Sequence, residues 1–366
     1  MSNFSSIFGD LVRHVQARID AASRNNKQIF DSAIYPTYLD WGTPTVSLSF
    51  EELLGKYGIS IAAATIGDGS KEPVIGQQGV ETYANKVLKH ALSRSLTTAE
   101  YRKVLAIMDS KSISGDEAKK QLIEIMWGAV SDVTKGVQAK IDMIFLGALS
   151  NEGVFTFDNT NNPEGGVKGT INYGMPGANV ATADTEWTEA NLATFDPFED
   201  LQDLIAAADD KVALSHFLIA PSKLNLMLRS KKMRAAVFGT DKSGSPLTLK
   251  SLNEFMESNS LPTFVKIRRT CNVKKGNDVY PVTPWNAKNI VAVPAGKLGI
   301  IENAYADSEL KQEPGVSYSM FERIRISQWG VGEAQGTNGT EFTKAESLSL
   351  PVLTEINGIY TLKTEN

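Results

Sequence analysis

One long amphipathic pattern in the first half of the chain limits the folds open to it. Ser114 and Glu117 form the S-x-x-E capping box that opens helices, and Gly153 is placed to stop one. A helix over residues 115–150 would be about 50 Å long at ~1.5 Å per residue, so we predict a spine helix that crosses a whole domain. Its apolar stripe, spaced in steps of three and four, consists of Ile123, Met126, Val130, Val133, Val137, Ile141, Ile144 and Ala148.

A β-rich segment precedes this helix. TPTVSLSF, starting at Thr43, predicts one strand, and GISIAAATI and PVIG predict two more on either side of the polar tip 67–73. A ribbon of two strands buries little of its own surface and is marginal in water. We therefore predict that residues 43–95 form a β-hairpin arm that lies on another surface, followed by a short helix at 97–108.

The first twenty residues predict an amphipathic helix with one apolar stripe. Two interpretations remain open: the helix packs on its own domain, or it docks on a neighbouring subunit. A membrane-surface helix is disfavoured. The stripe consists of Phe4, Ile7, Phe8, Leu11, Val15 and Ile19.

Beyond the spine helix, strand and helix signals alternate, which predicts an α/β lobe over residues 177–310. Within it, Asp196 is a predicted N-cap, Pro197 the first helical residue and Glu199 the end of a capping box. The chain returns to a β pattern from Tyr318. Its 366 residues favour two or three domains.

The residues that carry chemistry are scarce and scattered. The three histidines, His14, His90 and His216, fall in unlike elements, and Cys271 is the single cysteine. No nucleophile elbow, phosphate-binding loop or zinc-protease motif occurs. Asp158, with the Asn and Glu that follow it, lacks calcium-loop spacing and favours a plain turn. We therefore predict no catalytic residues, no cofactor and no metal.

Charge and hydropathy limit the partners. The formal net charge of −5 argues against a protein that neutralises phosphates to hold nucleic acid. Two basic runs, 229–234 and 266–269, indicate a solvated face or a patch that meets an acidic neighbour or packaged DNA. Residues 1–20 lack a signal-peptide core, and no long apolar run follows. We expect a soluble protein made in the cytoplasm with no membrane partner.

The order of these parts resembles the tailed-phage major capsid fold of the Hong Kong phage type, or Johnson fold, in its lambda-head-like branch. The similarity covers about residues 30 to 366 and is one of order and pattern. It is carried by TPTVSLSF, the descending arm EPVIGQQGVETYANKVLKHALSRSLTTAEYRKVL, the aliphatic end IFLGALSNEG, the lobe segments DPFEDLQDLI, FLIAPSKLNLMLRSKKMRAAV and VYPVTPWNAKNIVAVPAGKLGIIENA, and the closing SLPVLTEINGIYTLKT.

The resemblance implies an α+β fold divided into an N-terminal arm (1–42), an extended loop (43–95), a peripheral domain (96–176 and 311–366) with the spine helix 115–150, and an axial domain (177–310). It also implies a structural protein, not an enzyme, whose hexamers and pentamers tile an icosahedral shell around phage double-stranded DNA. Expected partners are further copies, with scaffolding, portal and cement proteins, and DNA only by non-specific proximity. Expected localisation is the virion, after synthesis in the host bacterial cytoplasm.

The predicted contacts between subunits come from the first helix and from the arm. An isopeptide cross-link from Lys71 to Asn338 or Asn357 is not expected, because nothing marks the buried carboxylate that would activate it. Two alternatives stay open: an encapsulin-like nanocompartment shell, and an α/β binding protein or enzyme with a site built from scattered residues. The contact residues are Phe4, Ile7, Phe8, Leu11, Ile66, Asp68, Lys71, Glu72 and Val74.

Overall fold

The computed structural model describes residues 11–24, 33–46, 88–109, 115–163, 169–208, 211–276, 278–331 and 340–365. The helices are α1 (Val12–Arg24), α2 (Tyr35–Tyr38), α5 (Thr98–Asp109), α6 (Gly115–Ser150), α7 (Pro197–Ala208), α8 (Pro221–Arg229), α9 (Lys231–Phe238), α10 (Leu249–Ser258) and α11 (Asp307–Leu310). The strands are β1 (Leu39–Trp41), β2 (Lys89–Ser95), β3 (Val154–Phe157), β4 (Gly169–Asn172), β5 (Val180–Thr182), β6 (Leu214–Ile219), β7 (Thr263–Lys266), β8 (Cys271–Lys275), β9 (Asp278–Val282), β10 (Asn289–Pro294), β11 (Gly299–Ala304), β12 (Ser317–Phe321), β13 (Ile324–Val331), β14 (Thr340–Val352) and β15 (Tyr360–Lys363).

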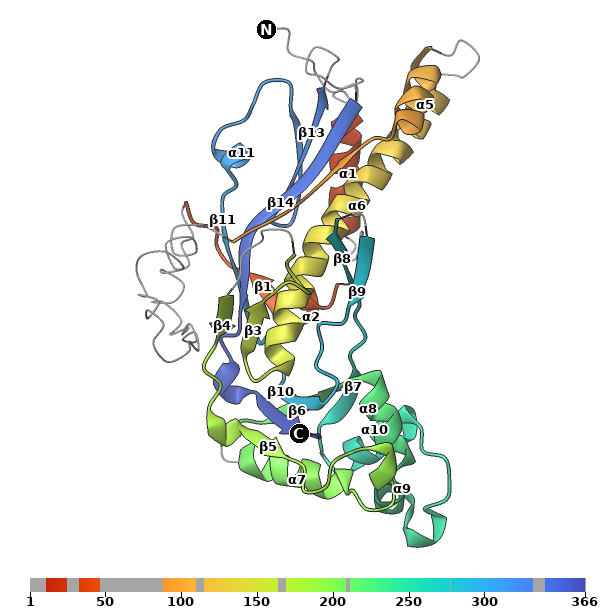
Figure 1. The fold of residues 1–366 in the computed structure, drawn as a ribbon, viewed down its shortest axis with the longest axis vertical. Helices are drawn as coiled ribbons and strands as arrows, with labels where there is room; N and C mark the ends of the chain where they lie inside the picture. Colours follow the sequence, from red (N-terminus) through yellow and green to blue (C-terminus); the bar gives the residue numbers. More distant parts are fainter. Residues whose placement is uncertain are drawn as a thin grey trace.

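The spine helix predicted over 115–150 is present as α6, which runs along the long axis of the molecule (Figure 1). Its predicted stripe is buried from Met126 to Ala148, and Ile123 is half-buried. Gly153 follows the helix with φ of +78°, a conformation that glycine adopts without strain, and its N–H donates to the carbonyl of Ala148 at 2.9 Å. Ser114 of the predicted capping box lies outside the described residues.

A six-stranded sheet packs against α6 along the upper part of the molecule (Figure 1). Its strand order is β1-β11-β14-β13-β12, and β2 pairs with β14. Helix α1 packs beside α6 and β12, where the Gln16 side chain donates to the carbonyl of Met320 at 3.1 Å and accepts from its N–H at 2.8 Å. For Val12–Arg24, the structure therefore favours packing on the chain's own domain.

The lower part of the molecule contains a second sheet, ordered β5-β15-β10-β6-β7, with α7 to α10 around it (Figure 1). The predicted start of α7 is confirmed: the Asp196 carboxylate accepts the N–H groups of Phe198 and Glu199 at 3.2 and 3.3 Å. A separate apolar core that includes Trp187, Phe195 and Phe217 fills this part. The lower sheet lies between the two buried cores: Leu218 of β6 belongs to the core around α6, and the neighbouring Phe217 belongs to the second core.

The sheets do not follow the predicted domain ranges strand by strand. β11 falls within the range 177–310 but lies in the upper sheet, between β1 and β14. β15 falls within 311–366 but lies in the lower sheet, between β5 and β10. The predicted domain boundaries stay a prediction. β11 and β15 each pair with strands from the other predicted domain.

The strand predicted from Thr43 is wrong in its described part. Residues 39–41 form β1 instead, and Thr45 makes only an isolated bridge to Ala304. Pro44 has no backbone N–H to donate, so the ladder is interrupted between Trp41 and Thr45. The strands predicted at GISIAAATI and PVIG lie outside the described residues.

Candidate functional site

Strand β2 carries the chain back from residues 47–87 onto the upper sheet, and its surroundings form the candidate site. We define the loop base as β2, the first turn of α5 and the part of α6 from Gly128 to Met143. β2 pairs with β14 over seven residue pairs, from Lys89–Leu348 to Ser95–Phe342. The loop base is the point where an arm made by the preceding residues would be held.

The faces of β2 differ because side chains alternate along a strand. The backbone N–H of Leu96 donates to the carbonyl of Glu341 at 2.9 Å, and the N–H of Ser349 donates to the carbonyl of Leu88 at 3.2 Å. The even-numbered residues of β2 are therefore the ones whose backbone groups are hydrogen-bonded to β14. The side chains of these even-numbered residues face α6. Leu92 lies so close to the helix that a Cβ on Gly136 would be 2.4 Å from its Cδ2. Gly136 therefore gives β2 room to lie on the spine helix.

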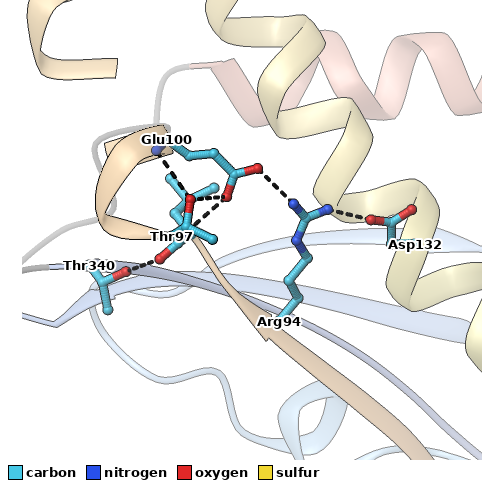
Figure 2. Close-up of polar contacts among 6 residues, drawn as sticks. Arg94, Thr97, Glu100, Asp132 and Thr340 are labelled. Carbon is cyan, nitrogen blue, oxygen red and sulfur yellow. Dashed lines mark hydrogen bonds and ion pairs between the residues drawn. The ribbon is translucent and has the colours of Figure 1, made fainter. Parts of the chain in front are cut away.

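Arg94 joins three elements at the upper end of the loop base (Figure 2). Its guanidinium binds Glu100 of α5 at 2.7 Å and forms an ion pair with Asp132 of α6. Glu100 also accepts the backbone N–H and hydroxyl of Thr97, at 2.8 and 3.0 Å, and Thr340 of β14 donates to the carbonyl of Leu96. The Thr97 N–H bond, with help from Arg94, lowers the pKa of the Glu100 carboxyl. These contacts fix the direction in which the chain leaves β2.

The patterns considered in the sequence did not predict this group of contacts. Thr97-Thr98-Ala99-Glu100 has the T-x-x-E spacing of a capping box, and Thr97 Oγ1 accepts the N–H of Glu100 at 3.2 Å. That local signal would have marked Thr97 and Glu100. The partners Asp132 and Thr340, in contrast, lie far away in sequence and carry no pattern of their own.

His90 is buried in the loop base and faces α6. Among the described residues, its Nε2 has no hydrogen-bond partner, and the side chain is 6% exposed. Burial lowers the pKa of His90 to about 4, and the positive charge of Lys140 acts in the same direction, while a hydrogen bond with the backbone of Ser349 opposes it. His90 is therefore neutral at neutral pH, and its side chain is buried beside the spine helix.

The segment before residue 47 is anchored through Asp142 in the buried part of α6. Its Oδ1 accepts the N–H of Ile34 at 3.0 Å and that of Tyr35 at 2.8 Å. The Tyr35 hydroxyl and Trp41 Nε1 both donate to Glu322, each at 2.9 Å. The chain on both sides of residues 47–87 is thus bound to the same upper part of the molecule.

Of the predicted contact residues, Leu11 alone lies in the part of the chain that the structure describes. Leu11 is buried in the main core of its own chain. The other contact residues lie outside the described residues, so a subunit contact through these side chains stays a prediction. The undescribed ones are Phe4, Ile7, Phe8, Ile66, Asp68, Lys71, Glu72 and Val74.

The residues considered for chemistry have ordinary surroundings. Asp158 Oδ1 accepts the N–H groups of Thr160 and Asn161, the geometry of a plain turn. Cys271 is buried, and His216 Nδ1 is hydrogen-bonded to Thr263 at 2.9 Å. Within the described ranges, no His, Cys, Asp and Glu side chains group as metal ligands, and no helix has the length and hydropathy of a membrane span.

The basic runs are paired in part with carboxylates. Arg229 forms an ion pair with Glu189, and Lys232 lies 3.5 Å from Asp196. Arg269 of the second run is buried against Asp142, so this residue does not belong to a solvated face.

Comparison with known proteins gives one family. Phage major capsid protein E matches residues 40–364. A chain from a prophage of E. coli CFT073, assigned as a capsid protein, has a TM-score of 0.59 at 10% identity, over 95% of this chain and 98% of that chain, which shows a shared fold.

Two further structures are too dissimilar to carry an argument. The mature capsid of bacteriophage PhiM1 has a TM-score of 0.40 at 8% identity, over 92% of this chain and 89% of that chain. The SrpI encapsulin of Synechococcus elongatus has a TM-score of 0.30 at 11% identity, over 95% of each chain. No curated protein sequence matches this chain.

Proposed function

This chain belongs to the phage major capsid protein E family, and from that premise we propose that its copies form the hexamers and pentamers of an icosahedral shell around double-stranded DNA. The protein is a structural component of a phage capsid, and copies of the chain are its partners in the shell. Two parts of this proposal go beyond the family match: the arrangement of the copies in hexamers and pentamers, and double-stranded DNA as the content of the shell.

The loop base is the observation that supports this proposal. Forty-one residues, 47–87, separate the bridge at Thr45 from β2, and both ends are bound to the six-stranded sheet. An arm held at two fixed points has a defined direction, so it can reach the same surface on each neighbour. A contact passed head to tail in this way closes into rings or extends into a lattice.

We propose the remaining partners and the location from the same family role. Scaffolding, portal and cement proteins are expected to bind the shell, and DNA to lie against it without specific contacts. The net charge of −5 suits a wall around DNA better than a protein that grips it. Synthesis in the host bacterial cytoplasm precedes incorporation into the virion.

Deletion of residues 58–76, bridged by a short Gly/Ser link, tests the proposal. We expect a folded, soluble subunit that forms no shells, because a two-stranded ribbon of the kind predicted here buries little surface of its own. The control inserts the same link beside Gly244, where an added Cβ would meet nothing within 4 Å, and should leave assembly unchanged. Sedimentation and electron microscopy measure particles, and nuclease-protected DNA inside them separates a phage head from a cargo compartment.

Two results would count against the proposal. Normal shells from the deletion variant would show that the segment makes no essential contact. Loss of the cooperative unfolding transition would show instead that the segment belongs to the core of the subunit. A small discrete oligomer of the full chain under assembly conditions would favour a binding protein or an enzyme.

A further inference from the structure

Each of the two large sheets ends in a strand that pairs on one side only. Among the described strands, β12 of the upper sheet pairs with β13 alone, and β7 of the lower sheet pairs with β6 alone. The outer side of such a strand presents N–H and C=O groups that can pair with a strand of another chain, so proteins commonly cover or block their sheet edges. The contacts on the outer sides of β7 and β12 therefore show how this chain handles its edges.

A side-chain amide occupies the outer edge of β7. It comes from Asn253 of α10, the helix that lies beside β7 (Figure 1). Asn253 Oδ1 accepts the N–H of Phe264 at 2.8 Å, and Asn253 Nδ2 donates to the Phe264 carbonyl at 3.0 Å. A carboxamide has the same donor and acceptor groups as a peptide unit. Asn253 therefore makes the two hydrogen bonds that a residue of an added strand would make with Phe264.

The same arrangement recurs at the outer edge of β12. Gln16 Oε1 accepts the N–H of Met320 at 2.8 Å, and Gln16 Nε2 donates to the Met320 carbonyl at 3.1 Å. Gln16 belongs to α1, which packs in the main core, whereas α10 packs in the separate core of the lower part. Two unrelated helices thus each place one amide on the last strand of a sheet. We call the pairs Asn253–Phe264 and Gln16–Met320 the edge clamps.

The clamp on β7 lies where it blocks pairing. The N–H of Ile267, just after the strand, donates to the Ile219 carbonyl of β6 at 2.9 Å, so the odd-numbered residues of this segment bond to β6. The N–H and C=O groups of Phe264 and Lys266 therefore point outward. Because β7 has four residues, a strand of another chain could not pair along it without displacing Asn253 from Phe264.

We propose that the edge clamps keep free subunits from associating through the outer edges of their sheets. Without the Asn253 amide, β7 of one copy can pair antiparallel with β7 of a second copy across a two-fold axis, and without the Gln16 amide β12 can do the same. The proposal goes beyond the proposed function, because it concerns the unassembled subunit. The two clamps are a device against association in an arrangement other than that of the assembled protein.

Asn253→Ala tests the clamp on β7. We expect the unassembled subunit to dimerise about tenfold more strongly than the wild type, because the N–H and C=O groups of Phe264 become available to a second copy. The control is Asn259→Ala, just past the end of α10, which removes an exposed amide that donates to the Phe255 carbonyl at 2.8 Å and should leave self-association unchanged. Sedimentation velocity over a concentration series measures the dimer, at a temperature at which circular dichroism shows both variants to be folded.

Gln16→Ala tests the second clamp independently, in the other part of the molecule. Its control is Asp20→Ala, which removes the 2.7 Å bond between Asp20 and the Gln16 side chain but leaves the two bonds to Met320. Each single variant should form dimers and no larger species, because only one edge is free of its clamp. The variant that combines Gln16→Ala with Asn253→Ala has two such edges in each copy, so it should form chains that lengthen with concentration.

A proline locates the contact between the copies. Lys266 is exposed and its N–H points away from β6, a position at which an edge strand tolerates proline. Lys266→Pro should abolish the dimers of Asn253→Ala, because it removes an outward donor of β7, and should leave those of Gln16→Ala unchanged. Amide hydrogen exchange at Lys266 should slow when Asn253→Ala dimerises. A clamp variant that stays as monomeric as its control, or Asn253→Ala dimers that persist with Lys266→Pro, would overturn the proposal.

Discussion

Arg269 and Asp142 form an ion pair in which both side chains are withdrawn from water. Arg269 Nε lies 2.7 Å from Asp142 Oδ2, and the side chains are 8% and 0% exposed. Asp142 also accepts two backbone N–H groups from the segment before β1. One carboxylate therefore joins the spine helix, the connection between β7 and β8, and the segment that leads toward residues 47–87.

Asp142→Asn should destabilise the subunit strongly. The substitution keeps the shape of the side chain but leaves the Arg269 guanidinium without its counter-charge, which costs about 3–5 kcal/mol at a buried site. Urea unfolding of unassembled protein measures the loss. The control is Glu124→Gln, which breaks the exposed pair with Arg18 and should cost at most ~1 kcal/mol. Similar losses in the free energy of unfolding of both variants would show that burial does not make the Asp142–Arg269 pair contribute more than the exposed pair.

Gly147→Ala should also destabilise the subunit. Its Cβ would lie 2.6 Å from Cδ2 of Phe155, a packed ring, and overpacking of this kind costs about 1–3 kcal/mol. Gly128→Ala, in the same helix but in open space, should stabilise it by up to ~1 kcal/mol. Thermal unfolding compares the two variants, and a shift in the same direction for both would be inconsistent with this packing.

His90 should make the subunit less stable in acid. Its pKa falls from 6.5 to about 4 on folding, so between these values the unfolded chain binds a proton that the folded chain does not. Stability is therefore complete above pH 6.5 and declines as the pH falls toward 4, by about 3 kcal/mol in total. Urea unfolding at pH 7 and pH 4 should show a smaller decline for His90→Gln than for the wild type. Equal declines would mean that His90 is not buried as a neutral side chain.

Truncations should separate two parts of the N-terminal segment. Val12, Val15 and Ile19 are buried in the core of their own chain, and each contributes about 1.5–3 kcal/mol. Removing residues 1–22 should therefore lower the melting temperature of the free subunit clearly. Removing residues 1–10 should leave it almost unchanged but reduce particle yield, if Phe4, Ile7 and Phe8 contact a neighbour. Equal melting temperatures for the two truncations would contradict this division.

Local patterns in the sequence predicted several elements correctly. The spine helix and the start of α7 follow from apolar spacing and from capping residues within a few positions of one another, and the short helix predicted over 97–108 is present at Thr98–Asp109. Such signals are readable because the hydrogen bonds they reflect join residues close in sequence. The same approach failed at Thr43, where the proline at position 44 should have argued against a strand.

The sequence by itself determined the spine helix, the short helix before it, the start of α7 and, by resemblance, the capsid family. Only the tertiary structure decided which strands pair and which charges meet. β15 joins the lower sheet and β11 the upper one, Arg94 meets Asp132, and Asp142 meets Arg269, across 38 and 127 residues of chain. Pairings over such separations depend on how whole elements pack, and a period of 2 or 3.6 residues carries no information about that choice.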